Sequence, residues 1–272
     1  MDKASVRSVV GVSVVVVMVA AAGCYPPPAT PPPDQDLAHA AQHVTDDILH
    51  QLGPDALTAH AMVIDPLLDG RTAQQTRACE RVQAQIATSL TATDHRLSLV
   101  PFNSAGAAQT RWLITGTLTP LPEPNRFRLA VALTDRQSGI VIAQAVTPFT
   151  EANLDLTPTK FYGDSPSLVR DRSTDGYLKT AQTPRGGAAD PLYIDQVPTS
   201  ALLADALAAY NAERWEDALK LYTNAVERQD GQQLRTFNGI YLTNVRLGRM
   251  KEAEERLQDE IAQILAQDGR AE

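Results

Sequence analysis

The sequence predicts an α+β protein: a mixed α/β sheet domain with helices packed on one face, followed by a C-terminal α-helical region. Two segments, 37–52 and 72–90, carry apolar residues at helical spacing. Aliphatic runs and alternating patterns between residues 61 and 146 are typical of strands. Another helical pattern covers 199–268. The order helix, strand, helix, strand and three-stranded meander indicates one sheet with helices against it.

Residues 1–23 have the pattern of a cleaved secretory signal peptide. Lys3 and Arg7 give a positive start, and the run Val9–Gly23 is almost unbroken Val, Ala and Gly. This run is shorter than the roughly 20 apolar residues that a membrane-spanning helix needs. An uncleaved anchor helix and the signal peptide of a soluble protein are the alternatives.

The end of this segment resembles the lipobox of bacterial lipoproteins, because the small residues Ala22 and Gly23 directly precede Cys24. The resemblance implies cleavage between Gly23 and Cys24 and a thioether-linked diacylglycerol on Cys24. Three acyl chains, palmitate among them, would then hold the protein firmly, whereas one chain binds only marginally. Tyr25 stands where an Asp tends to retain enteric lipoproteins at the inner membrane. We therefore expect the outer membrane, facing the periplasm, with the cell surface left open.

Residues 24–36 hold the lipidated cysteine and a proline-rich tether. Pro26–Pro28 and Pro31–Pro33 are two runs of three prolines. Such runs favour an extended polyproline II conformation of about 3.1 Å per residue. We expect a semi-rigid spacer between lipid and folded domain, rather than a ligand for a proline-recognition domain.

The composition excludes several classes of function. The 272-residue chain has a formal net charge of −8 and no basic patch, which argues against nucleic acid as a partner. With Cys24 assigned to lipid, Cys79 is the one other cysteine, so no internal disulfide is expected. Cys79 falls among the apolar residues of helix 72–90, and we interpret it as a small buried residue. No cofactor is expected.

The first helix, 37–52, has a polar side that could be mistaken for a metal site. Its apolar residues repeat at helical spacing, and Gly53 and Pro54 end it. Three histidines and an aspartate share the opposite side: His39, His43, Asp47 and His50. A closed tetrahedral zinc site needs a second ligand cluster, and none is visible in the sequence. We expect a solvated face and no metal.

Five strands are expected after this helix. They cover Ala61–Leu68, Arg96–Phe102, Arg111–Thr119, 126–133 and 140–146. Helix 72–90 connects the first two, and Thr72 is its expected N-cap. The last three form an antiparallel meander, with a hairpin-like connection at 135–139.

The meander resembles the envelope lipoprotein fold of FlgO-like proteins and of the curli secretion channel subunit. The resemblance rests on Trp112–Leu118, with an aromatic residue, an aliphatic pair and Thr-Gly, and on Leu129–Asp135 followed by Ser138–Val141. It implies that residues 37–150 form this α/β fold. Members include flagellar accessory proteins, enzyme activators and pore subunits, so the resemblance leaves the function open.

Residues 151–198 are expected to form an irregular connecting segment. Prolines and glycines interrupt any long periodic element here: Pro158, Gly163, Pro166, Gly176, Pro184, Gly186, Gly187, Pro191 and Pro198. Aromatic residues are frequent, among them Phe161, Tyr177 and Tyr193. We expect the segment to wrap over a folded surface or to dock to a partner.

Residues 199–268 resemble tetratricopeptide repeats. The first copy has small and aromatic residues at the family's spacing: Ala206, Ala209, Tyr210, Trp215, Ala218, Leu219, Tyr222 and Ala225. A weaker second copy follows, in which Ala253 aligns with Ala218. Two repeats fall short of the three or more that make a stable solenoid. We therefore expect packing on the α/β domain, dimerisation or capping of another protein.

By analogy with larger repeat proteins, the inner faces of these helices could hold a peptide. The candidate peptide-binding residues are Leu203, Leu207, Tyr210 and Asn211. The alternative is that these residues simply pack on the neighbouring domain.

The combination of lipobox, proline stalk, α/β unit and repeats resembles the N-terminal part of certain OmpA-like envelope proteins. In those relatives a peptidoglycan-binding OmpA-like domain follows the repeats, whereas this sequence ends at Glu272. The resemblance therefore does not extend to peptidoglycan binding.

Together these features predict a non-catalytic scaffold or protein–protein interaction module in an envelope assembly, with an envelope protein or a second copy as partner. The alternatives are a subunit of a secretion or flagellar accessory complex, and an envelope hydrolase. The sequence holds neither Gly-X-Ser-X-Gly nor His-Glu-X-X-His. A hydrolase would need a histidine such as His60 or His95 beside a pocket carboxylate.

Overall fold

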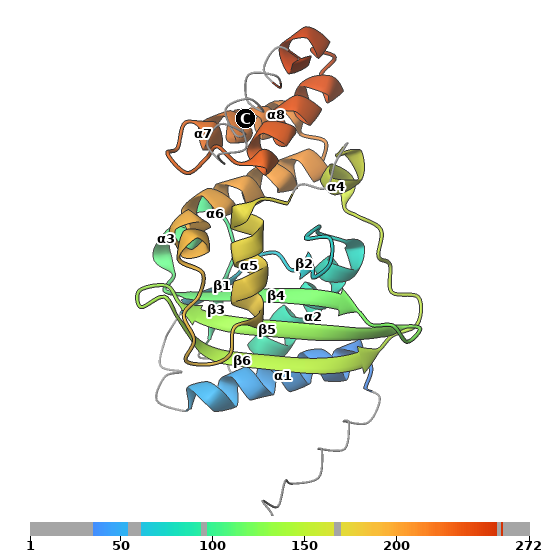
Figure 1. Cartoon of the computed structure of the whole chain (residues 1–272), viewed down its shortest axis with the longest axis vertical. Helices are drawn as coiled ribbons and strands as arrows, with labels where there is room; N and C mark the ends of the chain where they lie inside the picture. Colours follow the sequence, from blue (N-terminus) through green and yellow to red (C-terminus); the bar gives the residue numbers. More distant parts are fainter. Residues whose placement is uncertain (1–34, 54–60, 94–96, 166–169, 255–256, 258–272) are drawn as a thin grey trace, which may run out of the picture. The chain divides into compact units, whose positions relative to one another are not determined.

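A mixed β-sheet lies at the centre of the described part of the chain (Figure 1). The computed structural model describes residues 35–53, 61–93, 97–165, 170–254 and 257. All of them belong to one compact unit, Pro33–Glu272. The predicted signal peptide, Cys24 and nearly all of the tether lie outside the described residues.

The strands follow the order β3-β1-β4-β5-β6. Their bounds are β1 (Ala61–Ile64), β2 (Leu68–Asp69), β3 (Ser98–Val100), β4 (Trp112–Pro120), β5 (Arg126–Asp135) and β6 (Ile140–Thr150). β1 pairs in parallel with β3 and β4, and the short β2 also pairs with β4. β4, β5 and β6 form the predicted antiparallel meander. The predicted helices and strands occur in the expected order, with β2 and α3 (Ser104–Gln109) in addition.

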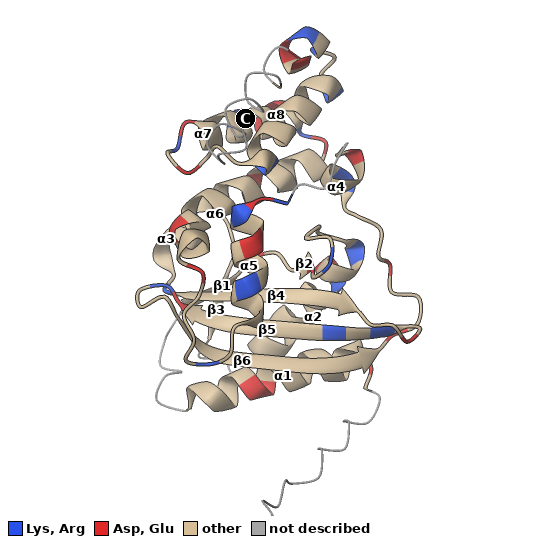
Figure 2. Ribbon diagram, in the orientation of Figure 1, with Lys and Arg blue, Asp and Glu red and all other residues tan. Residues whose placement is uncertain are grey.

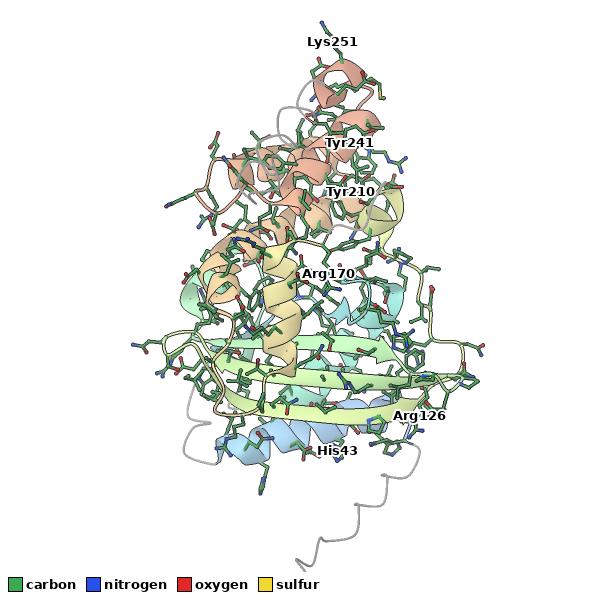
Figure 3. The ribbon with its side chains drawn as sticks, in the orientation of Figure 1. His43, Arg126, Arg170, Tyr210, Tyr241 and Lys251 are labelled. Carbon is green, nitrogen blue, oxygen red and sulfur yellow. The ribbon has the colours of Figure 1, made fainter. Side chains whose placement is uncertain are left out.

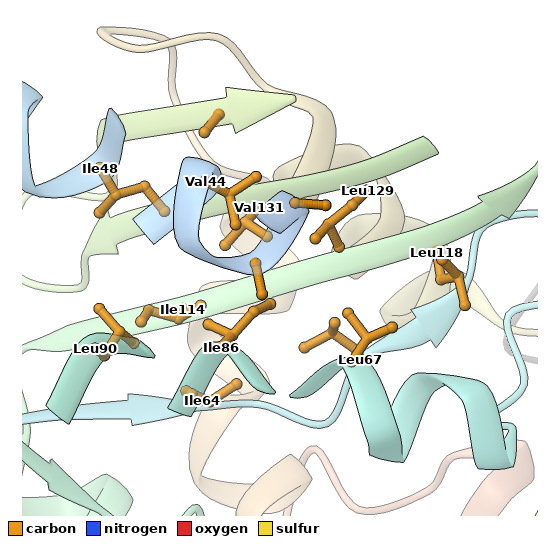
Figure 4. Packing of buried hydrophobic residues seen from close by; sticks show 14 of the residues in the cluster. Val44, Ile48, Ile64, Leu67, Ile86, Leu90, Ile114, Leu118, Leu129 and Val131 are labelled. Carbon is orange, nitrogen blue, oxygen red and sulfur yellow. The ribbon is translucent and has the colours of Figure 1, made fainter. Parts of the chain in front are cut away.

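Helices α1 (Leu37–Leu52) and α2 (Arg77–Thr93) cover one face of the sheet. Asp36 caps α1, because its carboxylate accepts a hydrogen bond from the His39 N–H at 2.9 Å. Figure 4 shows aliphatic side chains of both helices meeting those of the strands, among them Val44, Ile48, Ile86, Leu90, Ile114, Leu129 and Val131. Burying each such side chain contributes roughly 1.5–3 kcal/mol.

Helix α2 begins later than expected, because the residues before it form a tight turn. The Asp69 carboxylate accepts hydrogen bonds from the backbone N–H groups of Arg71 and Thr72 at 2.8 and 2.7 Å. Thr72 is therefore part of this turn and does not cap α2. Thr76 caps α2 instead, because its hydroxyl oxygen accepts a hydrogen bond from the Cys79 N–H at 3.2 Å.

Helices also cover the opposite face of the sheet, so the prediction of helices on one face is wrong. Three helices pack there: α3 (Ser104–Gln109), α5 (Arg172–Gln182) and the first half of α6 (Pro191–Asn211). Neighbouring strand residues point to opposite faces. Val63 and Leu113 contribute to this second core, while Met62 and Ile114 contribute to the first. Strands that are apolar on both faces need cover on both.

The segment 151–198 is largely helical, so the prediction of an irregular connecting segment is wrong. It contains α4 (Lys160–Asp164), all of α5 and the start of α6. Pro191 occupies the first turn of α6, where its missing N–H is tolerated. Pro198 lies inside α6, which continues through it beside the buried Val197 and Ala201. A proline inside a helix costs about 3 kcal/mol, and tertiary packing offsets this cost here.

The C-terminal region is helical, as predicted, in α6, α7 (Trp215–Val226) and α8 (Leu234–Arg246). Aromatic rings fill the space between these helices and α4. The ring of Tyr210 stands edge-on to those of Phe161 and Trp215, with centroids 5.6 and 4.9 Å apart. Gly239 lets α8 approach the Tyr222 ring, because a Cβ there would lie 2.3 Å from ring carbon Cε1.

Charged residues are dispersed over the described helices and strand ends (Figure 2). Within the described ranges, no helix combines the length and the apolar character that crossing a membrane requires. The same residues contain no group of three or more His, Cys, Asp and Glu side chains placed to hold a metal ion.

Candidate functional site: a polar cavity at the strand ends

The four predicted peptide-binding residues do not share one surface. Leu203 and Tyr210 are fully buried in the core of the helical region. Figure 3 shows Tyr210 among the C-terminal helices. The Tyr210 hydroxyl donates a hydrogen bond to the Asp164 carboxylate at 2.8 Å. Leu207 and Asn211 instead line a cavity between the helices and the sheet. Leu203 and Tyr210 therefore pack in the helical core, whereas Leu207 and Asn211 line the cavity.

This cavity has a volume of about 380 Å³ and lies at the carboxyl ends of β1 and β3. Asp65 follows β1, and Phe102 lies just beyond β3, so the strand ends form one wall. Helices α4, α5, α6 and α8 close the other side with Tyr162, Tyr177, Tyr193, Leu207 and Arg235. The volume falls within the roughly 300–1,000 Å³ of ligand pockets.

The connectivity of the sheet explains this position. The chain leaves β1 toward α2 on one face, and it leaves β3 toward α3 on the opposite face. β1 and β3 are neighbouring parallel strands. Connections that diverge in this way leave a crevice beyond the carboxyl ends of the strands, where open α/β sheets bind their ligands.

Asp65 is the buried acid of the cavity. Its backbone N–H is fixed by a 3.0 Å hydrogen bond to the carbonyl of Ile114, and its Oδ2 accepts a 2.6 Å hydrogen bond from the Tyr193 hydroxyl. Burial raises the pKa of Asp65 to about 7, although the Tyr193 hydrogen bond and the charge of Arg235 both act to lower it. Asp65 thus changes its charge near neutral pH.

Arg235 is the buried base of the cavity and comes from the first turn of α8. Burial opposes its charge, yet the neighbouring Tyr162, Asp171 and Asp65 leave the pKa of Arg235 raised. Besides a side-chain hydrogen bond with Tyr162, the guanidinium makes a long hydrogen bond of 3.4 Å to Oε1 of Gln233. The guanidinium therefore remains charged and keeps donors available to the cavity.

Two tyrosines hold the wall in place. The Tyr177 hydroxyl accepts a hydrogen bond from the Gly116 N–H at 3.0 Å, and it lies 2.9 and 3.0 Å from the carbonyl oxygens of Gly116 and Pro66. The Tyr177 ring stands edge-on to that of Tyr193, with centroids 5.4 Å apart. These contacts attach α5 and α6 to the strands at the cavity.

Three buried polar atoms of the lining have no hydrogen-bond partner among the described residues. They are the hydroxyl oxygens of Ser173 and Ser200 and the Nε of Arg235. Ser173 and Ser200 are only 3% and 5% exposed. Buried polar atoms are normally satisfied, and each unsatisfied one costs about 1–3 kcal/mol. Other buried hydroxyls without a described partner lie away from the cavity, among them those of Thr45, Thr115 and Thr236.

The residues weighed for other chemistry lie elsewhere. The side chains of His39 and His43 are exposed on α1 beside Asp36 and Asp47, so the predicted solvated face is confirmed. Figure 3 shows His43 on this helix. Cys79 is buried as predicted, and burial raises the pKa of its thiol to about 11. The cleavage flank at Gly23, the lipidation site Cys24, His60 and His95 lie outside the described residues.

Sequence reasoning missed the cavity because its parts are far apart in the chain. Asp65 and Tyr193 are 128 residues apart. One local signal was available, since Asp65 follows an apolar strand directly and precedes a proline. The expectation that 151–198 was irregular concealed Tyr177 and Tyr193.

The cavity at the strand ends is lined by polar and apolar side chains and covered by helices, and it has the position and size of a ligand pocket in an open α/β sheet. No family model matches the chain, and no curated protein does. The solved structures that it resembles include the LpoB C-terminal domains from Salmonella enterica and Escherichia coli. Both are 12% identical, and the match covers 43% of this chain and 100% of theirs, with TM-scores of 0.33 and 0.35.

The NMR structure of E. coli LpoB is also similar, at 15% identity, over 54% of this chain and 84% of that one, with a TM-score of 0.32. Likenesses at this level assign neither a family nor a function to the chain.

Proposed function

We propose that this chain is a lipid-anchored lipoprotein of a bacterial outer membrane, facing the periplasm, that acts by binding rather than by catalysis. It serves as an interaction module in an envelope assembly, with an envelope protein or a second copy of the chain as its partner. The lipobox ending at Gly23 and Cys24 supports the anchor. The polar cavity supports the binding role.

The observation that carries the binding role is the construction of the cavity from distant elements. The strand ends supply Asp65 and Phe102, while α6 and α8 supply Tyr193, Leu207 and Arg235. A molecule in the cavity touches the sheet and the helices at once. Its binding favours one arrangement of the helices, and those helices are the elements proposed to meet a partner protein.

The chemistry of the lining suits the binding of a ligand. Among the described residues, it offers hydroxyl, amide and charged groups at fixed positions, which recognise a ligand through hydrogen bonds and charge.

Two finer assignments belong to the same proposal. Ala206, Ala209, Ala218 and Ala225 are buried in the helical core, and small residues at such positions support a tetratricopeptide-like pairing of α6 with α7. The order helix, strand, helix, strand and meander supports a FlgO-like assignment for 37–150.

The anchor is tested by fractionating cells that express wild type, Cys24→Ser or Cys79→Ala and by measuring the intact mass of the protein. We expect wild type and Cys79→Ala in the outer membrane as lipidated chains that begin at Cys24. Cys24→Ser should accumulate as an unlipidated precursor, because it lacks the thiol that takes the lipid. Cys79→Ala is the matched control, since it removes the other cysteine. Mature Cys24→Ser protein in the outer membrane would contradict the anchor.

The interaction role is tested by affinity capture with the mature chain from envelope extracts, together with the oligomeric state of the purified protein. We expect a stable envelope protein partner or self-assembly. Recovery of neither would contradict this part of the proposal.

One observation favours a second candidate, an envelope hydrolase. Asp65 lies in the cavity with a pKa of about 7, and the Tyr193 hydroxyl is 2.6 Å away. Carboxyl groups with a raised pKa in a pocket are typical of general acids and bases. Hydrolysis of ester or amide substrates by wild type, lost in Asp65→Asn, would replace the binding proposal.

A further inference from the structure

We propose that the cavity binds a small zwitterion of amino-acid size, with its ammonium group against Asp65 and its carboxylate against Arg235. This inference rests on the proposed binding function and names the class of ligand.

The cavity contains two side chains of opposite charge that do not form an ion pair with each other. Asp65 and Arg235 both line it. None of the ion pairs within 4 Å among the described residues involves either of them. Tyr162 and Asp171 act on the charge of Arg235, and Tyr193 hydrogen-bonds Asp65, but neither charged group has an ion-pair partner within 4 Å among the described residues. A ligand that carries both signs supplies a partner to each.

A second feature of the cavity is the set of donors around Arg235. Its Nε has no hydrogen-bond partner among the described residues, and guanidinium groups bind carboxylates through parallel N–H donors. The hydroxyls of Ser173 and Ser200, which line the same cavity from α5 and α6, are also unpartnered. Three residues of the lining therefore carry a buried donor without a partner among the described residues.

A third feature of the cavity is the acceptor at Asp65. Within the described part of the chain, its carboxylate accepts one side-chain hydrogen bond, from the Tyr193 hydroxyl to Oδ2. Its other oxygen is left for a donor from the cavity. An ammonium group provides both the donor and the positive charge.

The size and remaining lining complete the description of the ligand. Ile64, Leu68, Phe102 and Leu207 supply apolar surface beside the charged groups. A volume of about 380 Å³ accommodates an amino acid or a dipeptide. We therefore assign the ligand an aliphatic or aromatic side chain.

Calorimetric titration of the detergent-solubilised mature protein at pH 8, where Asp65 is ionised, tests the proposal. The probes are L-leucine, L-phenylalanine and the dipeptide alanyl-leucine. Each is compared with its N-acetyl derivative, which lacks the ammonium group, and its C-terminal amide, which lacks the carboxylate. We expect at least one zwitterion to bind, and either modification to weaken it on the order of tenfold or more. This comparison uses the wild-type protein alone, so it does not depend on the folding of a variant.

Variants identify the groups in the cavity. Arg235→Gln and Asp65→Asn should each weaken binding on the order of tenfold or more, because each leaves one ligand charge without its partner. The exposed pair Arg214 and Asp217, 3.0 Å apart, supplies the matched controls Arg214→Gln and Asp217→Asn. These two should leave the affinity unchanged.

Absence of binding by all three zwitterions, or equal binding of the modified derivatives, would overturn the inference. So would an equal loss of affinity in the control variants. The proposed function would survive these results if a protein partner is still captured. Binding followed by breakdown of the dipeptide would instead support the ligand class and overturn the non-catalytic role.

Discussion

At the scale of single residues, Asp65 makes an unfavourable contribution to folding that a ligand could relieve. Its carboxylate is buried, and a single side-chain hydrogen bond within the described residues, from Tyr193, satisfies it. Because burial raises its pKa to about 7, part of the population holds a proton on Asp65 at neutral pH. Burial thus disfavours the ionised form of Asp65, and carboxyl groups with perturbed pKa values are typical of functional sites.

The raised pKa gives a prediction for stability as a function of pH. Between an ordinary pKa near 3.8 and about 7, the folded protein holds a proton on Asp65 that the unfolded chain releases. The contribution of Asp65 to the free energy of unfolding therefore falls as pH rises through this window. From pH 5 to pH 8 we expect wild type to lose roughly 2–3 kcal/mol relative to Asp65→Asn.

Urea unfolding of wild type and Asp65→Asn at pH 5 and pH 8 measures this difference. The other titratable groups that line the cavity, namely Tyr162, Tyr177, Tyr193, Arg235 and Glu80, are common to both proteins and cancel in the comparison. Asp217→Asn, at an exposed site, serves as control and should follow wild type. If the difference in the free energy of unfolding between wild type and Asp65→Asn is the same at both pH values, the pKa of Asp65 is not raised in the folded protein.

At the scale of elements, the close approach of α7 and α8 depends on one glycine. The Tyr222 ring, which comes from α7, packs directly against Gly239 of α8. A methyl group there would overlap the ring, and overpacking of this kind typically costs about 1–3 kcal/mol. We expect Gly239→Ala to lower the free energy of unfolding by that amount, measured by denaturant or thermal unfolding.

Gly163→Ala is the matched control for this substitution. Gly163 also lies in a helix, but the nearest atom to an added Cβ is the Pro158 carbonyl oxygen at 4.0 Å. Alanine favours helix over glycine by up to about 1 kcal/mol, so this variant should be as stable as wild type or slightly more stable. Equal stability of Gly239→Ala and Gly163→Ala would contradict the tight packing of α7 and α8.

Elements with strong periodicity were predictable from sequence, and elements held by tertiary packing were not. α1, β4 and β5 begin and end close to the predicted residues, while β6 continues four residues beyond its predicted end at Val146. α6 escaped prediction in its first half because Pro198 disrupts the local pattern, while burial on the second face of the sheet holds the helix. α3 is too short for any periodicity to indicate it.

At the scale of the whole molecule, the candidate site depends on topology that no local pattern contains. Leu207 and Asn211 were singled out for a peptide and do line the cavity, but Asp65 and Arg235 were not considered. Asp65 reaches the cavity through the divergence of β1 and β3, and Arg235 through the packing of α8 over α6. Composition and spacing cannot predict that Asp65 and Arg235 meet in one cavity, because their meeting follows from the order of the strands and the paths of their connections.

The proposed protein combines a lipid anchor with a binding unit, and a single measurement can detect both. Native mass spectrometry of wild-type protein extracted from its membrane in mild detergent resolves covalent and non-covalent mass together. We expect a chain that begins at Cys24, carries three acyl chains, and holds a bound protein partner, a second copy or a small ligand. An unmodified chain without any bound species would contradict the account.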